Sequence, residues 1–152
     1  MKFLVLFFFY LVAGAEQEAR TNSMPCCRES IGTAACLDIK SKNPNSFKNR
    51  CQSDADFAII QCCKSCNTNV PELGRNLFAY GIKSKHCFDR HNKKFCQQFL
   101  HQSGMWAGNN KEQMSCNGES AALAFRICRR TCGFCNPDIY DEQNFRANCP
   151  QL

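Results

Sequence analysis

Cysteine limits what this chain can fold into more than any other feature. There are 14 cysteines in 152 residues, a density typical of small proteins held together by disulfides. The densest run is Cys128-Arg-Arg-Thr-Cys132-Gly-Phe-Cys135. Side chains four residues apart share one face of a helix, so we expect Cys128 and Cys132 to lie on one helical turn. Gly133 predicts the end of that turn, because glycine tolerates the left-handed conformation of a helix cap.

The start of the chain indicates the compartment in which these disulfides form. Lys2 precedes an unbroken apolar run over residues 3–12, and the small residues Ala13-Gly14-Ala15 follow. This pattern predicts a secretory signal peptide over residues 1–15, cleaved before Glu16. The run is too short to span a membrane comfortably. We therefore expect a secreted, extracellular protein that does not span the membrane and carries oxidised cysteines.

The remaining cysteines fall into two blocks, at residues 26–66 and 87–135, with one more at Cys149. Residues 67–86 hold no cysteine and are expected to form a linker, and residues 136–152 a C-terminal tail. Each block alone is too small to bury much apolar surface, so covalent bonds are expected to supply much of the stability.

The two blocks repeat one pattern. Eight residues separate Cys27 from Cys36, as eight separate Cys87 from Cys96. Residues 62–66 and 128–132 both read cysteine, any residue, base, hydroxyl, cysteine. An acidic residue follows the first cysteine by two places, and a base follows the fourth by two. This register aligns Cys66 with Cys132; a rival register makes Cys63 and Cys66 the fifth and sixth cysteines of the first block.

The second block resembles the ShK toxin-like (ShKT) domain of sea-anemone potassium-channel toxins, which also occurs in tandem in secreted nematode proteins. The resemblance is carried by Cys87-Phe-Asp89 with eight residues to Cys96, and by the run from Cys128 to Cys135 that contains Thr-Cys-Gly. It covers residues 87–135, and the first block is a divergent match. It implies a small disulfide-rich fold of short helices and turns, built from two tandem modules.

The resemblance also implies a disulfide pairing, which spacing alone cannot choose. In the second block it gives Cys87–Cys135, Cys96–Cys128 and Cys116–Cys132. In the first block it suggests Cys36–Cys62 and Cys51–Cys66. The first block lacks the sixth cysteine, so we expect Cys27 to pair with Cys63. That leaves Cys26–Cys149, although the adjacent Cys26 and Cys27 are hard to tell apart.

The repeated acids and bases predict structural charge pairs, Asp89–Arg130 and Glu29–Lys64, of the kind that contributes only about 0–1 kcal/mol when exposed. Two residues are candidates for binding a partner. Trp106, the only tryptophan, lies in the long segment between Cys96 and Cys116 and could serve as an aromatic anchor. Arg129 could contact an anion. The alternative roles are core packing for Trp106 and structure for Arg129.

Other chemistry finds little support in the sequence. Cys63-x2-Cys66 and Cys132-x2-Cys135 have zinc-ligand spacing, but in an exported chain disulfides are favoured. No βαβ pattern surrounds a Cys-x2-Cys motif for redox catalysis, and no nucleophile motif accompanies His86, His91 and His101. The net charge of +6 is dispersed, without a nucleic-acid recognition motif. We expect no enzyme activity, no cofactor or metal, and no nucleic-acid partner.

Six aromatic residues are expected in the core, and helices are expected over residues 54–60 and 121–127; the aromatics are Phe57, Phe78, Tyr80, Phe95, Phe99 and Phe125. The most favoured function is an extracellular binding or modulatory module, with an unidentified protein target such as an ion channel or receptor. The family's channel-blocking Lys-Tyr pair is missing, since Asn117-Gly-Glu follows Cys116. A monomer is expected. The alternatives are a structural component of matrix or cuticle, and an accessory module of a secreted enzyme.

Overall fold

The computed structural model describes residues 24–101, 115–143 and 149. Within these ranges the chain forms short helices and no strand, with a single bridge between Asp89 and Cys128. The fold is therefore small, helical and disulfide-rich, as the sequence predicted. Its elements are α1 (Thr33–Lys42), α2 (Pro44–Ser53), η1 (Asp56–Gln61), α3 (Cys63–Cys66), α4 (Val70–Leu77), η2 (Gly81–Lys83), α5 (Lys93–His101), η3 (Gly118–Ser120), α6 (Ala121–Ile127) and η4 (Pro137–Tyr140).

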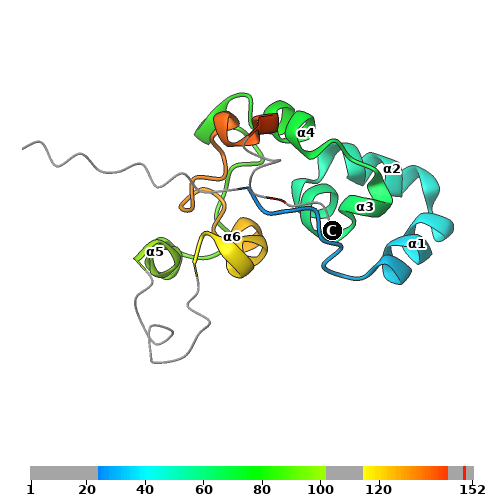
Figure 1. Ribbon diagram of the computed structural model, residues 1–152, viewed down its shortest axis with the longest axis horizontal. Helices are drawn as coiled ribbons and strands as arrows, with labels where there is room; N and C mark the ends of the chain where they lie inside the picture. Colours follow the sequence, from blue (N-terminus) through cyan, green and yellow to red (C-terminus); the bar gives the residue numbers. More distant parts are fainter. Residues whose placement is uncertain (1–23, 102–114, 144–148, 150–152) are drawn as a thin grey trace, which may run out of the picture.

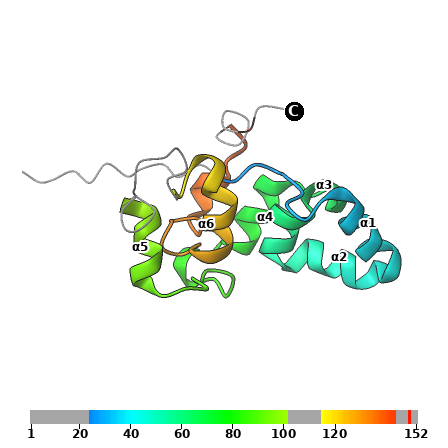
Figure 2. The same ribbon diagram turned by 90° about the horizontal axis from the view of Figure 1, so that it is seen from below.

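The helices gather at two ends of the molecule. In Figure 1, α1, α2 and α3 lie together at one end, and α5 and α6 at the other. Figure 2 shows α4 between the two groups. The helix expected before Cys128 is α6. Its counterpart in the first block is η1, a π-helix in which the Cys62 amide donates to the Phe57 carbonyl at 2.8 Å, one residue further back than in an α-helix.

Asparagine starts several of these helices. The Asn43 side chain accepts from the Ser46 amide at 3.0 Å, and Pro44 occupies the first helical position of α2. Asn69 and Asn136 accept in the same way at the starts of α4 and η4. A side-chain oxygen at this position satisfies an amide that has no partner within the helix, and proline is well tolerated just after it.

Residues 67–86, expected as a linker, are instead a folded part of the molecule. They form α4 and η2, and Phe78 is fully buried. Gly74 on α4 lies directly against Tyr140 of η4: a Cβ atom added at Gly74 would lie 2.0 Å from the Tyr140 ring. Tyr140 donates its hydroxyl to the Phe134 carbonyl at 2.6 Å. The tail thus packs onto a helix that the sequence did not predict.

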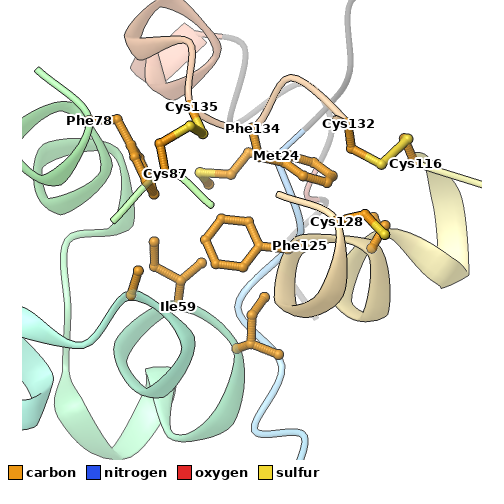
Figure 3. Close-up of a cluster of buried hydrophobic side chains, with 14 of the residues drawn as sticks. Met24, Ile59, Phe78, Cys87, Cys116, Phe125, Cys128, Cys132, Phe134 and Cys135 are labelled. Carbon is orange, nitrogen blue, oxygen red and sulfur yellow. A yellow bond between two sulfur atoms is a disulfide. The ribbon is translucent and has the colours of Figure 1, made fainter. Parts of the chain in front are cut away.

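One core joins the two blocks. Phe125 of α6 lies at its centre in Figure 3, with Ile59 of η1 on one side and Phe134 on the other. The Phe125 and Phe134 ring centroids are 5.5 Å apart in an edge-to-face arrangement. A second, smaller core under α1 and α2 contains Phe47 and Phe57, whose centroids are 5.3 Å apart. The two blocks are therefore not independent domains with separate interiors.

Most of the expected core aromatics are buried, and one is not. Phe57, Phe78, Phe99 and Phe125 are buried, and Phe95 is half-buried. Tyr80 is 81% exposed, so the expectation that it lies in the core was wrong. Tyr80 directly precedes η2, a turn in which no residue is buried. Tyr140, which the sequence analysis did not select, stacks on Phe78 instead, with centroids 5.4 Å apart.

Candidate functional site

Seven disulfides use all 14 cysteines of the chain. Their S–S distances lie between 1.96 and 2.12 Å. The structure brings together the same seven pairs that were expected from the sequence: Cys26–Cys149, Cys27–Cys63, Cys36–Cys62, Cys51–Cys66, Cys87–Cys135, Cys96–Cys128 and Cys116–Cys132.

The last turn of each block ends in the same way. In the second block Gly133 has φ +75°, and the amides of Gly133 and Phe134 donate to the carbonyls of Arg130 and Arg129. In the first block Asn67 has φ +51°, and the amides of Asn67 and Thr68 donate to Lys64 and Cys63. Both are left-handed caps of the Schellman type. This agreement favours the register that aligns Cys62 and Cys66 with Cys128 and Cys132.

The acid of each block binds the hydroxyl residue of that turn rather than the base. Asp89 accepts from the Thr131 amide at 3.0 Å and from the Thr131 hydroxyl at 2.7 Å. Glu29 accepts from the Ser65 amide. Burial alone would raise the pKa of the Glu29 carboxyl, but hydrogen bonds from Ser65 and Thr33, together with the Lys64 charge, lower it.

The predicted ion pairs, Asp89–Arg130 and Glu29–Lys64, are not among the salt bridges within the described ranges. That part of the expectation was wrong. The acid still ties the start of each block to its last turn, through its hydrogen bonds with Ser65 or Thr131.

Arg129 joins the two blocks through buried contacts. Its side chain is 3% exposed, and its guanidinium binds the carboxylate of Asp56 on η1 and the His86 carbonyl, the latter at 2.7 Å. The guanidinium also lies 4.1 Å from the centroid of the Phe125 ring. Arg90, which is more exposed, binds the other oxygen of Asp56. Burial lowers the pKa of Arg129, and the Asp56 carboxylate opposes that shift.

Arg129 is therefore not available to an external anion, and its role is structural. The other candidate anchor, Trp106, lies outside the residues that the structure describes, as do the predicted signal peptide and its cleavage site. The sequence analysis missed Asp56. The available signal was a single carboxylate at the start of the apolar run Phe57-Ala-Ile-Ile60, where an unpaired charge would be costly.

His86 and His91, the histidines whose side chains the structure describes, lie in separate surroundings. His91 stacks on Phe95 with ring centroids 4.0 Å apart, and it accepts from the Asn92 amide. His86 is half-buried, and burial together with the charges of Lys85 and Arg129 lowers its pKa. Within residues 24–101, 115–143 and 149, no three histidine, cysteine or acidic side chains are placed to hold a metal ion.

A groove of about 790 Å³ lies between α2, α4 and the loop that follows α3. Phe47 of α2 and Leu73 and Leu77 of α4 line its apolar part. The exposed side chains Lys48 and Gln52 of α2 and Glu72 and Asn76 of α4 line its polar part. The size falls within the range of about 300–1,000 Å³ usual for ligand pockets. Nothing in the sequence analysis anticipated this groove.

Comparisons with known proteins give this chain no relative: no family model, no curated protein and no solved structure matches it. Among the helices that the structure describes, none is both long enough and apolar enough to cross a membrane.

Proposed function

We propose that this chain is a secreted, extracellular binding protein of the ShKT type that modulates a protein target. It acts as a monomer, without enzyme activity or a cofactor. An ion channel or a receptor is the class of target that the resemblance suggests. The missing lysine after Cys116 argues against pore block by the route of the family's toxins, so binding would use another surface.

The observation that carries this proposal is that every cysteine is paired within the chain. Seven internal disulfides suit an oxidising environment and leave no thiol for links to neighbouring molecules. A crosslinked matrix or cuticle component would need such links, so the closed set of pairs favours a soluble binder over the structural alternative. The repeated cap and acid geometry of the two blocks supports the tandem-module interpretation.

The proposal is tested by secreting the chain from eukaryotic cells and comparing two forms of it as bait. One form keeps its disulfides, and the other is reduced and alkylated. Both are incubated with the extracellular fraction of the source tissue and crosslinked. The proposal predicts a monomer beginning near Glu16 and a protein partner held only by the oxidised form. Recovery only as reducible oligomers, or equal capture by both forms, would contradict it.

A further inference from the structure

The groove between α2 and α4 has the chemistry of a peptide-binding site. We propose that it binds an extended peptide segment of a partner protein that carries an acidic side chain. This inference rests on the proposed binding function and specifies the surface through which it operates.

The two walls of the groove are continuous helix faces. On α2 the lining residues are Pro44, Phe47, Lys48, Cys51 and Gln52, a spacing of three and four that keeps side chains on one side of a helix. On α4 the pairs Glu72–Leu73 and Asn76–Leu77 repeat after four residues. Each wall therefore carries an apolar row and a parallel polar row.

The core leaves the apolar row of α4 partly uncovered, but it covers Phe47 in the row of α2. Leu73 and Leu77 are half-buried, whereas Phe47 is 3% exposed and packs against Phe57. The apolar surface thus offers aliphatic contact for one or two side chains of a ligand. It offers no open aromatic face for stacking a sugar ring, because Phe47 is already covered.

The polar rows are free to bind a ligand. The side chains of Gln52 and Asn76 have no hydrogen-bond partner among the described residues, and neither does the ammonium group of Lys48. An amide side chain both donates and accepts, which matches the alternating N–H and C=O groups of an extended backbone. Two such amides, on α2 and on α4, can engage a backbone from both sides.

The charged side chains of the groove favour one orientation of a bound peptide. Lys48 stands on the α2 wall and Glu72 on the α4 wall. Lys40, which also lines the groove, places a second ammonium group 5.7 Å from the Phe47 ring centroid. Two lysines against one glutamate favour an acidic group on the ligand beside α2. A charge-assisted hydrogen bond is about twice as strong as a neutral one, so this contact would fix the orientation of the peptide.

The groove takes one wall from the first cysteine block and the other from the segment between the blocks. Its walls are α2, which lies between α1 and η1, and α4, which lies between the two cysteine blocks. The disulfide Cys51–Cys66 holds α2 against the end of α3, and Asn69 caps the start of α4. Both walls are therefore held in position before a ligand binds, which reduces the entropic cost of binding.

The experiment selects random linear decapeptides displayed on phage against the full secreted chain with its disulfides intact. Enriched peptides are synthesised, and their binding is followed by NMR amide shifts. We expect peptides with a shared acidic residue and shifts confined to α2, α4 and residues 65–69. Lys48→Glu should weaken binding by about tenfold or more, equivalent to about 1.4 kcal/mol. The double variant Gln52→Ala with Asn76→Ala should weaken it by a similar factor.

The matched control is Lys94→Glu, which makes the same charge change at an exposed position on α5 and should change affinity less than twofold. Peptides that never enrich, that shift residues elsewhere, or that lose affinity equally with Lys94→Glu and Lys48→Glu would overturn the inference. If the partner captured by the oxidised chain binds the Lys48→Glu variant unchanged, the groove proposal fails while the binding function stands.

Discussion

The two cysteine-rich blocks place different residues at the same position of their last turn. In the first block Cys63 occupies the position after the fourth cysteine and forms a disulfide with Cys27. In the second block that position is Arg129, which reaches Asp56 of the first block. The first block therefore uses the position to close itself covalently, and the second uses it to attach to its neighbour through charge.

This difference explains how one pattern can be repeated and still give a single core. The second block has the sixth cysteine, Cys135, and closes with Cys87, which leaves the position of Arg129 free. The first block has Asn69 where that cysteine would stand, so Cys63 takes over the closure. Asp56 lies on η1, where the helix widens by one residue. The contact between the blocks depends on a buried carboxylate that neither copy needs for its own closure.

The largest effect is expected from breaking that contact. Asp56→Ala leaves the buried Arg129 guanidinium without its counter-charge, and such losses typically cost about 3–5 kcal/mol. Urea unfolding with the disulfides intact measures the change. The double variant Asp56→Leu with Arg129→Met should lose less stability than Asp56→Ala, because it leaves no unpaired buried charge.

The exposed pair of Asp38 and Lys42 on α1 is the control for this experiment. Lys42→Ala should change the free energy of unfolding by less than about 1 kcal/mol. Equal losses for Lys42→Ala and Asp56→Ala would contradict the assignment of Arg129 and Asp56 as the contact that joins the blocks.

A smaller effect is expected from removing the closing disulfide of either block. Replacing Cys27 and Cys63 by alanine should cost about 2–4 kcal/mol, measured by thermal unfolding. The sequence separations are 36 for this pair and 48 for Cys87–Cys135. Because the entropic term grows only with the logarithm of loop length, the two double variants should differ by less than about 1 kcal/mol. A loss in only one block would show that Cys63 does not stand in for the sixth cysteine.

The two helix caps should differ in how they respond to a substitution at the left-handed residue. Gly133→Ala places a Cβ atom at φ +75°, which should cost about 1–2 kcal/mol. Asn67→Gly relieves the smaller strain at φ +51° and should leave stability unchanged or slightly raised. Calorimetry on both variants measures the difference, with Gly133→Asn as an intermediate. No loss on Gly133→Ala would argue against the shared cap.

The smallest effect concerns acid stability. The folded-state pKa of Glu29 lies below its ordinary value of 4.5. Its carboxylate therefore stabilises the fold above about pH 4.5, and this contribution is lost as the pH falls through the folded-state pKa. Glu29→Gln should cost about 0.5–1.5 kcal/mol at pH 7 and flatten the dependence of unfolding on pH in acid. The exposed Glu119→Gln variant should keep the wild-type slope.

The arrangement of the cysteines could be anticipated from the sequence, because the cysteine pattern repeats along the chain. The register of the two blocks follows from spacing, the end of the turn from Gly133, and helix α6 from the residue pattern of positions 121–127. The seven pairs required the resemblance as well. The acids of the repeat were correctly chosen, but their partners were not: the hydroxyl in the repeat, Thr131 or Ser65, was as visible as the base.

The contact between the blocks, helix α4 and the groove could not be anticipated, because they depend on how separate elements pack. No spacing rule relates Asp56 to Arg129, which are 73 residues apart. Helix α4 looked like a linker because it lacks cysteine, yet Gly74 lies there against Tyr140 of the tail. The groove arises only when the polar rows of α2 and α4 face one another across the loop after α3. Each of these features depends on tertiary contacts between segments that lie far apart in the sequence.

A disulfide map tests the central claim most directly. The secreted chain is digested without reduction, and the linked peptides are identified by mass spectrometry, with fragmentation that separates Cys26 from Cys27 and Cys62 from Cys63. If the two blocks are copies of one covalently closed unit, we expect the bonds Cys27–Cys63 in the first block and Cys87–Cys135 in the second, and no free thiol. Free thiols, or a bond between Cys63 and any residue other than Cys27, would contradict the account.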